Sequence, residues 1–270
     1  MEHSVSRIYP QRTPGTVPHP KPSMQVFRRR ILIASDGTPQ PRMRVALEDD
    51  FHHFRLSLRL VQGRIAAVRS SAPRHPYSLC PDAGDALAAL VVGMVPDAAS
   101  HTVTRSVEAS RQCTHLLDMI GLACASAARN LSRQRYDIEV PVRVGGRTRA
   151  SLWRNGELVL GWDVLEGRIE GPAPYCGVDW HRGMARWALS SLPAEEAEAA
   201  LVLRRCVMIS LGKTKPLDLQ IHALPTGLCY AQQPERAAQA LRRIGSTWDF
   251  SANPERLCQD DAAWLSFSES

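Results

Sequence analysis

Two cysteines in the first half of the chain each lie directly before a predicted helix. Cys80 precedes a helix that we expect to begin at Pro81, and Cys113 precedes one that Thr114 can cap. A thiol at a helix N-terminus faces unpaired backbone amides, which stabilise the thiolate and lower the thiol pKa. Because the thiolate is the form that binds metal ions or attacks an electrophile, the pattern predicts two reactive thiols.

Two histidines accompany these cysteines. His115 follows Cys113 by two residues, and His52 begins a stretch in which apolar and polar residues alternate. Period-two alternation is typical of a strand that is buried on one face. The stretch places His52 on the apolar face with Phe54, Leu56, Leu58 and Leu60. The same register directs His53 toward solvent.

Together these residues predict a metal or thiol site. Its expected ligands are His52, Cys80, Cys113 and His115, with His115 as the fourth ligand or a proton carrier, and we expect the two sulfur atoms to converge. His115 and Cys229 are the predicted catalytic residues. Two cysteines with one or two histidines suit zinc or iron. Each residue taken singly also has a simpler interpretation, since buried cysteines often only fill space and a histidine can lie in a core or in solvent.

The remaining pattern predicts an α+β protein with antiparallel sheets and helices packed on one face. Gly145-Gly146 and Asn155-Gly156 are two-residue hairpin signals that join three strands of a meander. Helices are expected at 81–92, 114–131, 180–192, 194–210 and 234–243. The predicted organisation is a disordered leader at 1–23, an α+β region at 24–134 with the metal site, a β-meander with helices at 135–252, and a C-terminal tail at 253–270.

Composition narrows the class of protein. The chain has 270 residues, 44% of them hydrophobic, with a formal net charge of +6, which is typical of a globular protein without a nucleic-acid module. The run Arg28-Arg29-Arg30 is interpreted as a solvated strand end rather than a phosphate or nucleic-acid patch. Because residues 1–23 lack the apolar core of a secretion signal, we expect no export, and no stretch approaches the roughly 20 apolar residues that a membrane span needs. Seven cysteines in a chain of this length favour reduced thiols in the cytoplasm.

Several short motifs resemble an uncharacterised bacterial family, domain of unknown function 2889. The likeness is carried by Asp50-Phe51-His52-His53, Gly63-Arg64-Ile65, Pro76 to Pro81, Cys113-Thr114-His115-Leu116, Leu152 to Gly156, Leu203-Arg204-Arg205, Gly227 to Tyr230, Pro234-Glu235-Arg236 and Gly245-Ser246-Thr247. The resemblance implies a bacterial protein but no activity.

The order of ligands also resembles scaffold proteins of the IscU/NifU iron–sulfur type. Those scaffolds have a ligand on a strand, a hairpin with Asp-Gly-Arg-Ile, and two further ligands that each precede a helix. Here the order is His52, Gly63-Arg64-Ile65, Cys80 and Cys113. The resemblance implies an IscU/NifU-like first half with a metal pocket between strand and helix starts. His52 replaces the first scaffold cysteine, which argues against cluster assembly itself.

The leading functional hypothesis is a metal-dependent enzyme that acts on a small molecule. The metal would hold an open coordination position for water or substrate. One alternative is a non-catalytic metal or iron–sulfur carrier, and another is a structural zinc-containing binding module. The sequence contains no His-Glu-x-x-His, Gly-x-Ser-x-Gly or glycine-rich dinucleotide motif that would name a reaction.

Overall fold

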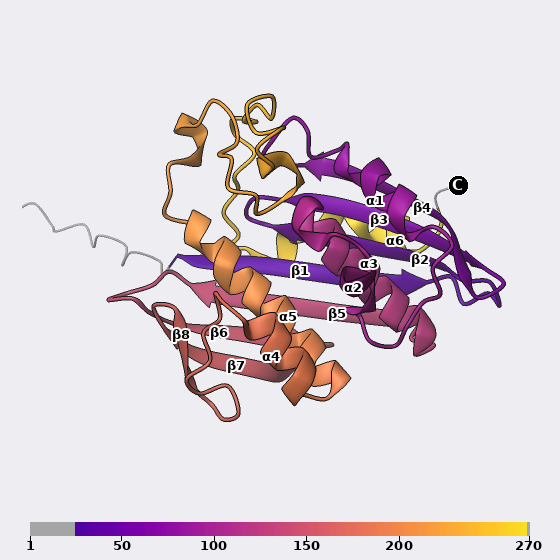
Figure 1. Ribbon diagram of the computed structural model, residues 1–270, viewed down its shortest axis with the longest axis horizontal. Helices are drawn as coiled ribbons and strands as arrows, with labels where there is room; N and C mark the ends of the chain where they lie inside the picture. Colours follow the sequence, from indigo (N-terminus) through magenta and orange to yellow (C-terminus); the bar gives the residue numbers. More distant parts are fainter. Residues whose placement is uncertain (1–24, 269–270) are drawn as a thin grey trace, which may run out of the picture.

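A single antiparallel sheet of eight strands organises the protein (Figure 1). The computed structural model describes residues 25–268, so the leader predicted at 1–23 lies outside the described residues. The strand order is β4-β3-β2-β1-β5-β6-β7-β8. The strands are β1 Val26–Ser35, β2 Arg42–Asp49, β3 His53–Val61, β4 Arg64–Arg74, β5 Arg133–Pro141, β6 Arg147–Arg154, β7 Glu157–Leu165 and β8 Arg168–Gly171.

Among the described residues, three α-helices lie in the chain between β4 and β5, and three more follow β8. They are α1 Ala83–Val91, α2 Thr102–Ser106, α3 Thr114–Ala128, α4 Met184–Ser191, α5 Ala194–Ile209 and α6 Ala262–Leu265. Short 3₁₀ turns occur at Ala109–Arg111, Ser210–Gly212, Leu217–Leu219, Tyr230–Gln232, Pro254–Arg256 and Gln259–Asp261. The mixed class and the antiparallel sheet confirm the predicted α+β fold, while the IscU/NifU likeness of the first half stays a prediction.

Tight turns set the register of the meanders. Asn155 and Gly156 join β6 to β7 with φ angles of 52° and 91°, which a two-residue hairpin of the primed type requires. Gly145 and Gly146 lie between β5 and β6, also at positive φ. Both hairpins were predicted from these dipeptides, and both are confirmed.

The central strand β1 joins the two halves of the chain. It pairs with β2 on one side and with β5 on the other, so that Ile31 lies between Leu47 and Tyr136. The boundary predicted between residues 134 and 135 falls inside β5. The sheet and the main hydrophobic core therefore continue across that boundary.

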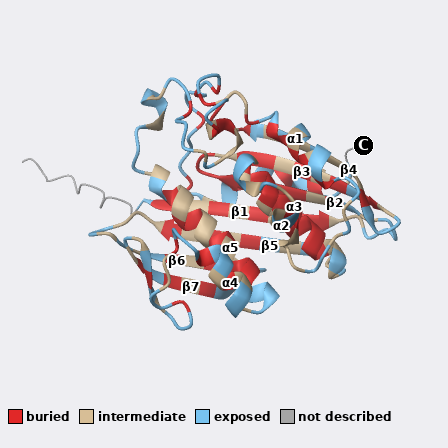
Figure 2. Ribbon diagram, viewed as in Figure 1, coloured by how far each residue is buried: buried red, intermediate tan, exposed pale blue. Residues whose placement is uncertain are grey.

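The long helices cover one face of this sheet. Helix α3 contacts β1, β2 and β3, and α5 contacts β5, β6 and β7. Figures 1 and 2 show both helices lying on the same face of the sheet, and Figure 2 marks many residues of the strands beneath them as buried. The main core fills this interface, which includes the fully buried Trp162 and Phe54.

The C-terminal segment covers part of the opposite face. Cys258 and Leu265 form a second small cluster with Ala34 and Ala46, and α6 contacts β2. Much of the segment predicted as a tail at 253–270 therefore packs on the sheet. Within the described residues, no helix is both long and apolar enough to cross a membrane.

The helix predicted at 234–243 is wrong. Residues 234–240 form successive turns instead, and the chain then makes bridges from Leu241 to His222 and from Arg242 to Tyr77. These long-range pairings use backbone groups that a helix would need. The result is an irregular segment, residues 213–250, that holds no α-helix or β-strand, and we call it the roof because it lies over the site described below.

Gly121 lets helix α3 pack closely against the loop that precedes α2. A Cβ atom on Gly121 would lie 2.3 Å from the carbonyl oxygen of Ser100. We predict that Gly121→Ala lowers stability by about 1–3 kcal/mol through overpacking, although alanine favours helix by about 1 kcal/mol. Gly167→Ala, where no atom lies within 4 Å, is the matched control. Urea unfolding of both variants measures the difference, and equal stability would contradict this seating of α3.

Candidate functional site

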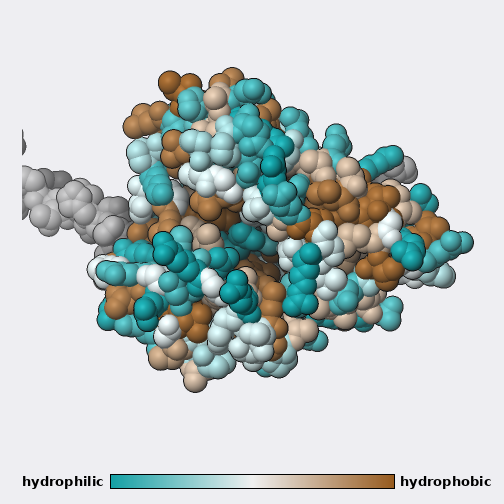
Figure 3. All heavy atoms as spheres, viewed as in Figure 1, coloured by the Kyte–Doolittle hydropathy of each residue, from teal (hydrophilic) through white to brown (hydrophobic). Residues whose placement is uncertain are grey.

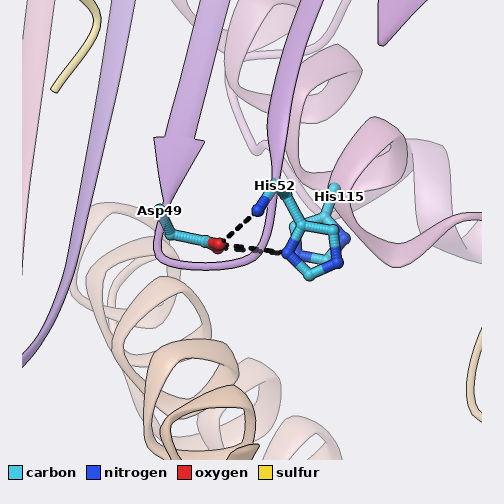
Figure 4. Close-up of side chains that lie close together, drawn as sticks. All are labelled: Asp49, His52 and His115. Atoms are coloured by element: carbon cyan, nitrogen blue, oxygen red, sulfur yellow. Dashed lines mark hydrogen bonds and ion pairs between the residues drawn. The ribbon is translucent and has the colours of Figure 1, made fainter. Parts of the chain in front are cut away.

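The turn between β2 and β3 positions the first functional residues. Asp49 ends β2, and its Oδ1 accepts hydrogen bonds from the backbone N–H groups of Phe51 and His52, both at 2.8 Å. Such an Asx turn is a local preference of aspartate. It reverses the chain tightly and directs the His52 ring toward α3 (Figure 4).

Asp49 forms a buried ion pair with Arg29 of β1. The Arg29 Nε lies 2.9 Å from Asp49 Oδ2, Nη2 also donates to that oxygen, and the two side chains are 1% and 0% exposed. Burial alone would raise the pKa of Asp49, but the Arg29 guanidinium and the neighbouring histidines hold it well below its usual range. Asp49 is therefore a carboxylate at neutral pH.

His115 contacts the same arginine from the first turn of α3. Its Nε2 lies 2.9 Å from Arg29 Nη2, and its ring packs on His52 with ring centroids 3.9 Å apart and a 36° angle between planes (Figure 4). A guanidinium has only donors, so Nε2 of His115 must accept this hydrogen bond. In the neutral ring the proton therefore lies on Nδ1.

Asp49 fixes the other histidine in the same way. His52 Nδ1 lies 3.0 Å from Asp49 Oδ1, and a carboxylate only accepts hydrogen bonds, so Nδ1 of His52 carries the proton. Burial lowers the pKa of His52, and burial together with His52 and Arg29 holds the pKa of His115 well below the usual value. Both rings are neutral at pH 7, with an unprotonated Nε2 on His52 and a protonated Nδ1 on His115.

A cavity of about 250 Å³ lies beside the two rings. Within the described residues, His52 Nε2 and His115 Nδ1 have no hydrogen-bond partner, yet neither is sealed from solvent. Both rings line the cavity, so these nitrogens are the ones available to a ligand. The other walls come from the β2–β3 turn, β3, the segment before α1, the starts of α1 and α3, α5 and the roof. They include Phe51, Phe54, Tyr77, Arg205, Met208 and Leu217.

The predicted site residues all line this cavity, but they do not form one cluster. Cys80, Cys113 and Cys229 are lining residues together with His52 and His115. Among the described residues, the group whose ligand atoms lie within 4.8 Å of one another is Asp49, His52 and His115. The four-ligand set with Cys80 and Cys113, and the catalytic role of Cys229, stay predictions.

The prediction of lowered thiol pKa values is wrong. Burial raises the pKa of Cys113 to about 12, although the backbone N–H groups of Leu116 and His115 oppose the shift. Burial also raises the pKa values of Cys80 and Cys229, and nearby thiols add to the shift at Cys80. The helix N-terminus acts as expected, but desolvation of the charged form outweighs it.

The prediction that His53 is exposed to solvent is also wrong. The alternation does turn His53 away from His52, but the C-terminal segment covers that face. His53 is only 7% exposed, and its Nε2 lies 2.9 Å from Asp261 Oδ2. The cover is local, because Arg55 and Ser57 on the same face of β3 are half-buried and Arg59 is exposed.

Sequence reasoning missed the two residues that orient the histidines. Arg29 was interpreted as part of a solvated run, but it is 1% exposed. The signal was its register: Phe27, Arg29, Ile31 and Ile33 fall on one face of β1. Asp49 was not considered as a site residue, although an aspartate three residues before a histidine fits an Asx turn.

The comparisons with known proteins agree with the family resemblance. Residues 34–129 match the model of the family described as Protein of unknown function (DUF2889). This confirms the predicted resemblance over a segment that holds Asp49, His52, Cys80, Cys113 and His115. Arg29 and Cys229 lie outside it. No curated protein matches the chain.

The buried neutral histidines predict a loss of stability in acid. The pKa of His115 is lowered in the folded protein, so below about pH 6.5 the unfolded chain gains a proton that the folded protein does not, and stability falls by about 1.4 kcal/mol per pH unit. His115→Gln should lose less stability than the unmodified protein between about pH 7 and about pH 5. Asp50, whose pKa burial raises to about 6, acts in the opposite direction but is common to both proteins. Thermal melts across this range test the difference, and parallel curves would contradict a buried neutral His115.

Proposed function

We propose that the protein is an enzyme that moves a proton on a small, largely apolar molecule bound in the cavity. His52 is the general base and His115 is the hydrogen-bond donor. The observation that carries the proposal is the pair of hydrogen bonds from the histidines to Asp49 and Arg29, which assigns opposite protonation to the two remaining ring nitrogens. Asp49 leaves Nε2 of His52 unprotonated, and Arg29 leaves the proton of His115 on Nδ1.

The pair suits abstraction of a proton next to a carbonyl group. His52 Nε2 takes the proton, and the resulting imidazolium is stabilised by Asp49 across a 3.0 Å hydrogen bond. His115 Nδ1–H donates to the oxygen on which negative charge develops. A positioned base of this kind contributes about 10²- to 10⁴-fold to a rate. Burial, His52 and the positive charge of Arg29 keep the pKa of His115 low. The ring therefore stays neutral, and its Nδ1–H remains available as a hydrogen-bond donor.

The surroundings favour a small molecule with an apolar body. Phe51, Phe54 and Met208 line the cavity, and a second hollow of about 440 Å³ shares Thr114, Arg205, Met208 and Leu228 with it. Apolar side chains also gather on the outside of the roof, where Leu219, Ile221 and Ile244 are 79–82% exposed (Figure 3). An elongated substrate could extend from the histidines into the second hollow.

The tautomers can be tested without a known substrate. We predict that long-range nitrogen–proton NMR at neutral pH finds His52 and His115 both neutral with the proton on Nδ1. His52→Gln and His115→Gln assign the signals, and His75→Gln, outside the cavity lining, is the control. A panel of small carbonyl compounds in heavy water should then yield deuterium incorporation that His52→Gln abolishes and His75→Gln preserves. A proton on His52 Nε2, or a cationic ring, would contradict the proposed base.

A metal-dependent reaction is the second candidate. It is favoured by the spacing of Asp49, His52 and His115, because two histidines and a carboxylate suit iron or zinc. The obstacle is Arg29, whose guanidinium already contacts both Asp49 Oδ2 and His115 Nε2. A metal ion bound by those two atoms would have to displace a buried cation.

Elemental analysis separates the two candidates. If this second centre exists, protein purified without added metal should hold about one zinc or iron per chain, and His115→Gln should lower that content sharply. Cys124→Ala is the control because Cys124 is buried in α3 away from the cavity lining. Metal content that is negligible, or unaffected by His115→Gln, would exclude a centre at these three residues and leave the acid–base proposal standing.

A further inference from the structure

Three of the seven cysteines line the same cavity, and they come from three separate parts of the chain. Cys80 lies in the turn before α1, Cys113 is the N-cap of α3, and Cys229 precedes the 3₁₀ turn Tyr230–Gln232 in the roof. Packing alone does not require thiols from three segments at one cavity. The other four, Cys124, Cys176, Cys206 and Cys258, do not line it.

We propose that Cys80, Cys113 and Cys229 together bind a thiophilic divalent cation, with zinc as the first choice, inside this cavity. Three thiolates are a common ligand set for zinc, and a fourth position stays open to water or substrate. The His52 Nε2 and His115 Nδ1 atoms reach the same cavity and can exchange protons with whatever occupies that position. This metal site does not depend on the proposed acid–base activity.

The charges around the cavity favour such a site. Zinc with three thiolates carries one net negative charge, and two arginines, Arg205 and Arg242, line the cavity. Burial raises the pKa of the Cys80 thiol and outweighs the nearby Arg242 guanidinium, which opposes the shift. Burial also raises the pKa of Cys113 and outweighs the N–H groups of His115 and Leu116. A bound dication would add the positive charge that these groups supply only in part.

Binding requires the roof to move. Zinc–sulfur bonds of about 2.3 Å bring sulfur atoms to about 4 Å from one another, whereas the three sulfurs are not all within 4.8 Å here. Cys80 and Cys113 lie at helix starts that pack on the sheet. Cys229 is half-buried in a segment without helix or strand, so it is the ligand that moves.

The full-length protein tests this site with cobalt(II) as the spectroscopic probe and zinc as the competitor. We expect one cobalt per chain, a sulfur-to-cobalt charge-transfer band in the near ultraviolet, and loss of the band when zinc is added. Cys80→Ser, Cys113→Ser and Cys229→Ser each remove a ligand, so each should weaken binding by at least the roughly 10- to 100-fold that loss of a hydrogen-bond partner of a metal ligand costs, while Cys124→Ala should not. His52→Gln should keep the charge-transfer band.

A measurement on the unmodified protein guards against variants that fail to fold. Because buried thiols of high pKa react slowly, the protein is first brought into enough urea to expose Cys80, Cys113 and Cys229 transiently. Zinc should then slow their alkylation by a maleimide, mapped by peptide mass spectrometry, while the exposed Cys176 stays reactive. No charge-transfer band, or no protection of these three cysteines, would overturn the proposal. Metal binding that is lost only in His52→Gln and His115→Gln would assign the metal to the Asp49 centre and also overturn it.

Discussion

The buried ion pair between Arg29 and Asp49 is the interaction on which the site depends. It joins the central strand β1 to the β2–β3 turn, and through His115 it reaches α3. Two charges without exposed surface are costly unless each is fully hydrogen-bonded, and removing one partner of such a pair typically costs about 3–5 kcal/mol. Asp49 meets this condition by accepting from Arg29, His52 and two backbone amides.

The same pair gives the two histidines different chemistry. One partner is a pure acceptor and the other a pure donor, so each histidine that contacts the pair receives a defined tautomer. His52 and His115 have the same ring and nearly the same burial, yet one presents a lone pair to the cavity and the other a proton. A buried salt bridge is weak evidence for stability, but here it has a second consequence, since it orders protons at the edge of a cavity.

The sequence was most informative where a pattern is local. The hairpins at Gly145-Gly146 and Asn155-Gly156, the helix after Cys113 and the opposite orientations of His52 and His53 all follow from residues a few positions apart, although His53 is the more buried of the two. Long-range facts were out of reach: the pairing of β1 with β5, the C-terminal cover over His53, and the bridges that replace the helix at 234–243. Arg29 is an intermediate case. The sequence places it on the buried face of β1, but it does not reveal the pairing with Asp49, which lies at the end of β2.

Two adjacent aspartates at the β2–β3 turn bind different parts of the protein, one the histidine site and the other the roof. Asp49 faces Arg29 and His52, whereas Asp50 holds the roof: its carboxylate accepts from Lys213 Nζ at 2.7 Å and from the Phe250 N–H at 3.2 Å. Its carbonyl oxygen accepts from the Trp248 N–H.

The two ends of the roof are thus tied to the same turn that positions His52. Between them the chain runs free of helix and strand and carries Cys229 to the cavity. A ligand that draws Cys229 inward would therefore pull on a segment that is anchored on Asp50, two residues before the proposed base His52. Closure of the cavity around such a ligand would then act, through Asp50, on the turn that fixes the His52 tautomer.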